Sequence, residues 1–306
     1  MSEYWKLGNK SLEKDKMEKK IRAYYLYNIR QNALRNIKMK ENNIPQKLKN
    51  NGNESKKSLK VAVITQSYYR KDGSSKKCLQ NMFKMLEAQT YKNFKVFITG
   101  DNYQPENEFI EVCNEYTGEI YLHNNNISCR DLKLGDIKNY WACGGVHAVY
   151  NSYLKAKEED YNIALMLDDD DYWNESYINN VVNNFIKYPD TGFMITKAEY
   201  CGSTLPRTSV NTIYYNNYIP LGADSVRSSS SHNISKIGDC ILKIWKDLID
   251  EVKKMNKEQE KWKLSPCDLG ILNVIGKKVI EGEYKSLFIP IVLVKKTNDC
   301  NWNNII

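Results

Sequence analysis

The stretch Ile163-Ala-Leu-Met-Leu-Asp-Asp-Asp-Asp-Tyr-Trp173 joins a short apolar run to four consecutive aspartates. The apolar run has the length of a strand buried on both faces, which is typical of a parallel sheet. Four adjacent carboxylates at the end of such a strand repel one another unless a cation compensates their charge. A divalent metal ion that also binds diphosphate oxygens is an economical partner. The simpler alternative is a solvated acidic turn before the next helix.

Strand and helix patterns alternate on both sides of this stretch. Residues 61–65 and 95–99 are strand-like, and apolar side chains repeat at helical spacing from Cys78 to Leu86 between them. A strand, a helix and a strand within about forty residues predict a parallel unit with a right-handed crossover. The sequence therefore predicts an α/β fold with a mostly parallel central sheet flanked by helices, and a site beyond the carboxyl ends of the strands. Further helices are predicted over residues 144–157, 174–187 and 237–252.

Charge is distributed unevenly along the 306 residues. The net charge is +8, but residues 1–60 alone hold 16 Lys or Arg against 6 Asp or Glu, and the rest of the chain is nearly neutral. Apolar residues at helical spacing predict a helix over 17–39, and the polar stretch 41–58 predicts a linker. We therefore expect a basic helical extension and linker over residues 1–57, followed by one folded domain over residues 58–306.

Composition argues against several classes of protein. The longest apolar run, Phe288 to Val294, is too short to cross a bilayer, and the polar residues 1–20 do not form a signal peptide. The eight cysteines show no CxxC spacing, so a zinc finger is not predicted, and we expect them to be reduced. A near-neutral domain argues against a nucleic-acid enzyme. We expect a cytoplasmic protein with no nucleic-acid partner.

Three motifs, in order along the chain, resemble those of family 2 glycosyltransferases. Val61-Ala-Val-Ile-Thr-Gln-Ser-Tyr-Tyr-Arg70 is similar to the opening strand and nucleotide loop of that family. Glu87-Ala-Gln-Thr-Tyr-Lys-Asn-Phe94 is similar to the end of its first helix, and Leu165-Met-Leu-Asp-Asp-Asp-Asp-Tyr-Trp173 resembles its metal-binding DxD segment. The resemblance covers residues 59–190 best. It implies a GT-A fold, a nucleotide-sugar donor, expected to be a UDP-sugar, and inversion at the anomeric carbon.

The resemblance also implies roles for the acidic segment and an acceptor class. Asp170 would be the principal ligand of Mn²⁺ or Mg²⁺, and Asp168 would face the metal and the ribose, with Asp169 also beside the donor. The acceptor would be the hydroxyl of a glycan or of a lipid-linked sugar, as in the biosynthesis of a surface polysaccharide.

The nucleoside pocket implied by the resemblance departs from the family pattern. Ser67 and Tyr68 would line this pocket, and Asp101 would contact the edge of the base. Gly100 stands where the family has another aspartate, which leaves the choice of base open. Residues 144–152 lack the arginine of the family's A-R-N-x-G segment, so one donor contact is missing or comes from elsewhere.

An inverting transfer needs a base that takes the proton of the acceptor hydroxyl as it attacks. The resemblance implies a carboxylate late in the domain, at the start of a helix, and Asp268 fits because it follows Ser265-Pro-Cys. The structural alternative is a carboxylate stabilised by the helix dipole. Asp239 is the competing candidate for the base. His232, in a serine-rich run, is expected on an exposed loop or in contact with the diphosphate or the acceptor.

Other functions and partners stay open. A nucleotidyltransferase acting on sugar phosphates would use a similar sheet, although residues 66–73 are a poor version of its Gly-rich basic loop. A catalytically inactive module that binds sugar, nucleotide or RNA is the third candidate. The basic extension has three interpretations: an arm packed on the domain or on a second subunit, a nucleic-acid arm, or an interfacial helix at the inner face of an anionic membrane. We favour packing over membrane contact.

Overall fold

The computed structural model describes residues 59–129, 144–200, 203–206, 213–216, 227–254, 278–279 and 282–296. The predicted basic extension and linker lie outside these residues, so the boundary at residue 57 and the role of the extension stay predictions. Within the described residues, no helix is long and apolar enough to cross a membrane.

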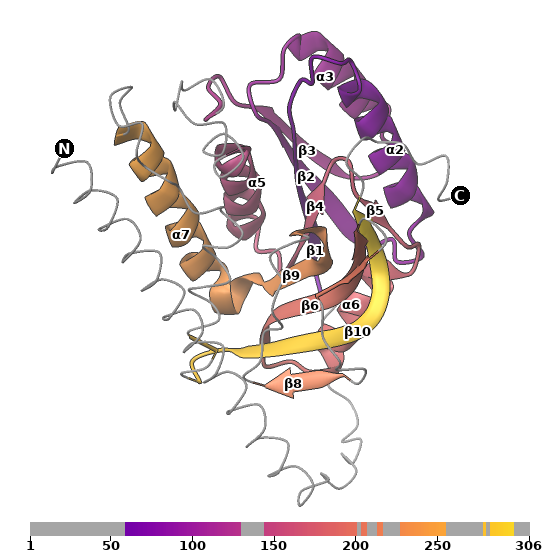
Figure 1. Cartoon of the computed structure of the whole chain (residues 1–306), viewed down its shortest axis with the longest axis vertical. Helices are drawn as coiled ribbons and strands as arrows, with labels where there is room; N and C mark the ends of the chain where they lie inside the picture. Colours follow the sequence, from indigo (N-terminus) through magenta and orange to yellow (C-terminus); the bar gives the residue numbers. More distant parts are fainter. Residues whose placement is uncertain are drawn as a thin grey trace, which may run out of the picture. The chain divides into compact units, whose positions relative to one another are not determined.

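One sheet runs through the described part of the chain (Figure 1). Its parallel half has the order β3 (Ile120–Asn124), β2 (Phe94–Gly100), β1 (Val61–Ser67) and β4 (Ile163–Asp168). Because these strands are parallel, their carboxyl ends lie at one edge of the sheet, and Gln66 of β1 pairs with Asp168 of β4 there. The predicted strand–helix–strand unit is confirmed.

The other half of the sheet is mixed. Strand β9 (Ser230–Asn233) lies antiparallel between β4 and β6 (Thr191–Tyr200), and β10 (Lys285–Lys296) runs parallel to β6. Strand β5 (Tyr172–Trp173) pairs with the end of β10, so the last residues of β10 lie next to the segment that follows β4. Two short strands, β7 (Ser203–Leu205) and β8 (Tyr214–Asn216), pair with β6 and β10.

Helices cover both faces of the sheet. Alternate residues of β1 separate the two cores: Val61 and Val63 pack with α2 (Ser75–Ala88), α3 (Glu106–Asn114) and α6 (Tyr177–Lys187). Ala62 and Ile64 pack with α5 (Val146–Glu158) and α7 (Ile234–Lys254). This is the period of two expected of a strand buried on both faces. The predicted α/β fold with a central sheet flanked by helices is confirmed.

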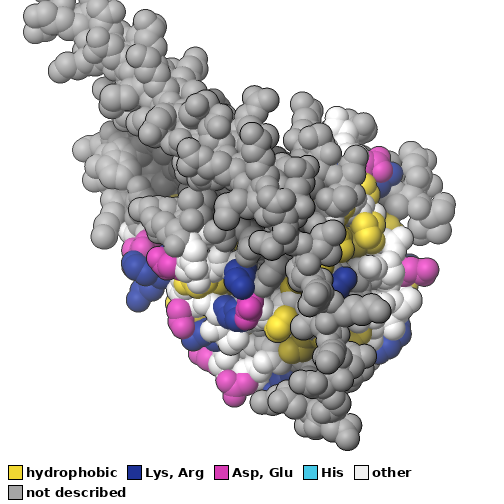
Figure 2. All heavy atoms as spheres, turned by 90° about the horizontal axis from the view of Figure 1, so that it is seen from below, with side chains coloured by type: hydrophobic (Ala, Val, Ile, Leu, Met, Phe, Trp, Pro, Cys, Tyr) yellow, Lys and Arg dark blue, Asp and Glu magenta, His cyan; other side chains and the backbone are white. Residues whose placement is uncertain are grey.

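One face of the described part is shown in Figure 2. Basic and acidic side chains are interspersed on it, with small apolar spots between them. Where described residues can be seen on this face, the Lys and Arg side chains therefore do not gather into one patch.

Two local predictions need correction. Cys78 on α2 is disulfide-bonded, while Cys113, Cys129 and Cys240 are free, so the expectation that all the cysteines are reduced is wrong. The serine-rich run is not an exposed loop, because Ser228 and Ser229 form a buried 3-10 turn and the next residues form β9.

Candidate active site

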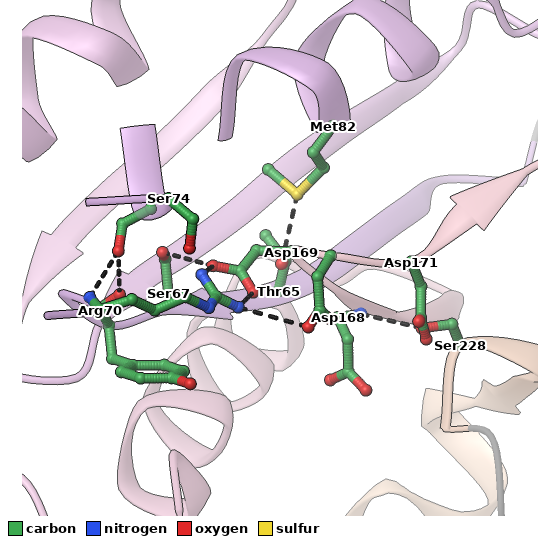
Figure 3. A network of polar contacts seen from close by, with 12 residues as sticks. Thr65, Ser67, Arg70, Ser74, Met82, Asp168, Asp169, Asp171 and Ser228 are labelled. Carbon is green, nitrogen blue, oxygen red and sulfur yellow. Dashed lines mark hydrogen bonds and ion pairs between the residues drawn. The ribbon is translucent and has the colours of Figure 1, made fainter. Parts of the chain in front are cut away.

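The four aspartates follow β4 at the carboxyl edge of the sheet, where the loops after β1 and β2 also lie (Figure 3). Hydrogen bonds and ion pairs join these aspartates to cations from three other parts of the chain: the loop after β1, the turn before β9 and the end of β10. The predicted acidic cluster is therefore built into a network of cations.

Asp169 is held by the loop after β1. The Arg70 guanidinium donates to both of its carboxylate oxygens, at 2.9 Å from Nη1 and 2.6 Å from Nη2, and the Ser67 hydroxyl donates at 2.6 Å. Asp169 raises the pKa of Arg70 although burial opposes that rise. A bidentate ion pair of this kind fixes the orientation of the Asp169 carboxylate and compensates its charge.

Asp168 is held from the opposite side. The Arg227 guanidinium donates to its Oδ1, at 2.9 Å from Nε, and Lys296 Nζ lies 3.6 Å from its Oδ2. Burial opposes ionisation of Asp168, but Arg227 and Lys296 together hold its pKa below the ordinary value. Asp168 is therefore the carboxylate of a partly buried ion pair.

Asp171 is fully buried and ties the acidic segment to the turn before β9. Its Oδ2 accepts a hydrogen bond from Ser228 Oγ at 2.6 Å and lies 3.8 Å from Lys296 Nζ. Burial raises its pKa to about 8. Ser228 also accepts from the backbone amide of Asp168 at 2.9 Å, so one hydroxyl connects both ends of the acidic segment.

Asp170 has a more open carboxylate than its neighbours. Its side chain is 23% exposed, against 6% for Asp169 and 0% for Asp171, and its Oδ2 lies 3.5 Å from the Arg70 guanidinium. Burial, followed by the charges of Asp169 and Asp168, raises its pKa to about 7. Burial is the first cause of this rise, and the Arg70 and Lys296 charges oppose it without cancelling it.

The residues predicted for the nucleoside pocket lie at the same edge. Ser67 is buried, and its hydroxyl is bound to Asp169. Tyr68 carries the Arg70 guanidinium over its ring at 4.6 Å from the centroid. Asp101 is 3% exposed; its amide donates to Ser67 O at 2.7 Å, and its Oδ2 accepts from Ser128 at 2.6 Å.

Packing explains one of the two departures from the family pattern. A Cβ on Gly100 would lie 2.3 Å from Asn124 Oδ1, so an aspartate does not fit there. Gly145, before α5, has a φ of +71° and would bring a Cβ within 2.5 Å of the Gln66 side chain. In the orientation that satisfies its amide, Gln66 donates to Gly145 O at 2.8 Å and accepts from Arg227 at 2.6 Å. Arg227 therefore lies close to the start of α5.

Asp268 lies outside the described residues, and its role stays a prediction. Asp239, the competing base, lies near the start of α7, and its carboxylate is 90% exposed and bound to Lys157 at 2.8 Å. Strand β9 runs antiparallel to β4 and leads into α7 at the amino end of β4. Asp239 is therefore at the edge opposite Asp168, and we reject it as the base.

His232 is buried inside β9, and both expectations for it are wrong. Its ring stacks on Phe193 with the centroids 5.1 Å apart and lies 5.9 Å from the ring of Tyr153. Neither ring nitrogen has a hydrogen-bond partner in the described part of the chain, and burial lowers the pKa of His232 to about 3. His232 is a neutral core residue.

Arg70, Arg227, Ser228 and Lys296 were not predicted as partners of the aspartates. Arg70 was within a quoted motif, but nothing in the sequence paired it with Asp169. Lys296 could have been found, because it lies two residues after the apolar run over 288–294, which is strand-like and brings the next residues to a sheet edge. Arg227 follows residues without a periodic pattern, so no sequence signal identifies it.

Comparison with proteins of known structure identifies the architecture. The structure of S. aureus TarS 1–349 superposes with a TM-score of 0.53 at 12% sequence identity, over 78% of this chain and 60% of TarS 1–349. The chain has the GT-A glycosyltransferase fold. Structures of TarS in complex with UDP and with UDP-GlcNAc match with TM-scores of 0.50, over 61% and 60% of their length.

Sequence comparison finds a relative that is named as a glycosyltransferase. The chain is 28% identical over 205 residues to the uncharacterized glycosyltransferase R139 of Acanthamoeba polyphaga mimivirus, a match that covers 60% of this chain and 82% of the relative. No family model matches the chain. The sequence relative is therefore named as a glycosyltransferase, and the structural neighbours share the fold.

Proposed function

We propose that this GT-A protein is an inverting, metal-dependent glycosyltransferase of family 2 that moves a sugar from a nucleotide-diphosphate donor to an acceptor hydroxyl. The observation that carries the proposal is the acidic segment at the carboxyl end of β4, beside the ends of β1 and β2. Ligands of open α/β sheets bind at this edge. The sequence likeness to a glycosyltransferase supports the same activity.

For the donor we propose a UDP-sugar. TarS, which has the same fold, binds UDP and UDP-GlcNAc, and this supports a uridine donor here. The buried Asp101 has one carboxylate oxygen bonded to Ser128, in the position expected to contact the base. Tyr68 offers a ring on which the base can stack, and Ser67 precedes it as the last residue of β1.

The residues present fit a divalent cation whose other ligands come from the bound substrate and from water. Among the described residues, no three His, Cys, Asp or Glu side chains form a group that could hold a metal ion. Mg²⁺ and its relatives commonly use one or two carboxylates together with substrate phosphates and water. Asp170 suits that role because its carboxylate is the most open of the four, at 23% exposed.

We assign metal binding chiefly to Asp170, with Asp168 as the second candidate. The carboxylate of Asp168 already pairs with Arg227 and Lys296, so it would bind a metal only by releasing one of them. A bound Mn²⁺ or Mg²⁺ would stabilise negative charge on the departing diphosphate. Asp268 remains our proposed base for the acceptor hydroxyl.

Arg227 is our candidate for the donor contact missing from residues 144–152. It reaches Gln66 next to the start of α5, where that segment departs from the family pattern. Arginine suits phosphate oxygens because its donors form a planar fork. Lys296, on the other side of Asp168, adds a second positive charge for the diphosphate.

A panel of nucleotide sugars tests the function. We expect UDP and one UDP-sugar to raise the thermal midpoint of the full-length protein when Mn²⁺ is present, because a ligand that binds only the folded state stabilises it. Slow metal-dependent release of UDP from that sugar should follow. Failure of every nucleoside diphosphate and nucleotide sugar to bind, with or without metal, would overturn the proposed function.

A further inference from the structure

Arg70 is fixed in place by the loop that carries it. Its guanidinium grips both oxygens of Asp169 and lies over the ring of Tyr68, and its side chain is only 12% exposed. The backbone amide of Arg70 donates to Ser75 Oγ at 2.6 Å, and that hydroxyl donates to Tyr68 O at 3.0 Å. The positive charge of Arg70 therefore occupies a defined position.

That position bears directly on Asp170. The Arg70 guanidinium lies 3.5 Å from Asp170 Oδ2, whereas Arg227 and Lys296 bind the carboxylates of Asp168 and Asp171. A cation on Asp170 would therefore lie close to the Arg70 charge and be repelled by it, because like charges at partly buried positions are weakly screened.

The charge balance of the cluster strengthens the effect. Among the described residues, the four aspartates face three cations, Arg70, Arg227 and Lys296, which leaves little net negative charge to hold a free divalent ion. A nucleoside diphosphate brings several negative charges of its own. Its arrival would satisfy the three cations and supply further oxygen ligands for a metal at Asp170.

We propose that Arg70 is a built-in counter-cation of the acidic cluster, which makes the binding of a divalent cation depend on the donor diphosphate. The inference rests on the proposed function, because it requires a nucleotide at this edge of the sheet. Arg70 acts here as a positioning residue: it holds Asp169 and sets the affinity of Asp170 for metal. Free metal binds weakly, and metal and nucleotide strengthen each other's binding by the same factor.

The test is a titration of the full-length protein with Mn²⁺, followed by calorimetry or by the electron paramagnetic resonance of the free ion, with and without saturating UDP. For the wild-type protein we expect weak binding of Mn²⁺ alone and at least about tenfold tighter binding with UDP. Arg70→Gln should bind Mn²⁺ alone at least about tenfold more tightly than the wild type, a change of about 1.4 kcal/mol. The enhancement by UDP should shrink in this variant.

Two further variants control the interpretation. Lys84→Gln removes one positive charge from the exposed surface of α2 and should leave both affinities unchanged. Arg70→Lys keeps the charge but cannot grip both oxygens of Asp169, so its affinity for Mn²⁺ alone should lie between those of the wild type and Arg70→Gln. If Arg70→Gln does not fold, Arg70→Ala, which also removes the charge, is required to show the same rise.

The outcomes separate the two proposals. Equal or weaker binding of Mn²⁺ alone in the folded Arg70 variants, while the wild type still binds UDP, overturns the role of Arg70 and leaves the proposed function standing. A wild type that binds neither UDP nor GDP, with or without Mn²⁺, overturns both. Tighter binding of Mn²⁺ in the variants supports the inference, since a merely structural loss would weaken the site.

Discussion

Ser228 donates its hydroxyl to Asp171 at 2.6 Å, across 57 residues of sequence. Both residues are fully buried, and the same hydroxyl accepts from the amide of Asp168, while the Ser228 carbonyl accepts from Trp173 Nε1 at 2.7 Å. One residue therefore anchors the acidic segment to the turn that carries Arg227. The geometry of the candidate active site depends on this connection.

Ser228→Ala should destabilise the protein. It leaves the buried Asp171 without its serine donor, and removing one partner of a buried hydrogen bond costs about 1–3 kcal/mol. The measurement is the free energy of unfolding in urea. Ser235→Ala, which removes an exposed hydroxyl bonded to Asn233, is the matched control and should change stability by less than about 0.5 kcal/mol. Equal stability of the two variants would contradict the anchoring role.

Asp170→Ala should abolish metal-dependent binding of the nucleoside diphosphate and leave the fold intact. The reason is that Asp170 has the most open carboxylate of the four aspartates, at 23% exposed, so its truncation removes the proposed metal ligand with little loss of packing. Thermal shift with UDP and Mn²⁺ measures binding, and circular dichroism checks the fold. Turnover that persists in this variant, or in the wild type with EDTA, would show that the assignment is wrong.

Asp268→Asn should lower kcat at least about a hundredfold and barely change donor binding, since loss of a general base usually costs that much. Asp239→Asn is the control: its carboxylate is 90% exposed and lies at the opposite edge of the sheet, so kcat should stay within about twofold of the wild type. Steady-state kinetics on an accepted donor measure both variants. A large loss in Asp239→Asn with none in Asp268→Asn would reverse our assignment.

Stability should fall in mild acid because of His232. The folded-state pKa of His232, about 3, lies below the ordinary value of 6.5, so the unfolded chain takes up a proton first as the pH falls. Neutral His232 makes its full contribution to the free energy of unfolding above pH 6.5. This contribution is lost as the pH falls towards 3, by about 1.4 kcal/mol per pH unit. Asp170 and Asp171 have raised pKa values and act in the opposite direction.

The comparison with His232→Phe isolates the histidine. The free energy of unfolding in urea is measured for both proteins at about pH 7 and about pH 5. Its decrease between these pH values should be larger in the wild type by about 2 kcal/mol, because the variant cannot take up this proton. The same dependence on pH in both proteins would refute a neutral, buried His232 as its cause.

Local patterns predicted β1, β2 and β4 of the parallel half of the sheet but not β3, while long-range pairing decided the rest. β1, α2, β2, α5 and β4 were predictable because each buries a regular apolar face, and neighbours along the chain are neighbours in space. Strand β9 could not be predicted, because its Ser-Ser-His-Asn sequence has no apolar alternation and its burial comes from β4 and β6 on either side. The aspartates were found from their position after a strand.

The cations around the aspartates could not be predicted from local patterns. Arg227 and Lys296 come from segments far along the chain, and the sheet order that brings them to Asp168 is a tertiary property. Sequence reasoning correctly required a compensating charge, but it assigned that charge to a metal alone. Three side chains of the protein supply much of it.

The close approach of Gly100 to Asn124 couples two positions of the sequence. A second aspartate at residue 100 requires a smaller residue at 124 at the same time, and that change removes the acceptor of the Tyr103 amide, which Asn124 binds at 2.9 Å. Either substitution alone is expected to be harmful, so their effects on stability will not be additive. We therefore expect an aspartate at residue 100 to be accommodated only together with a change at residue 124, so a library designed to alter nucleotide preference should vary both positions together.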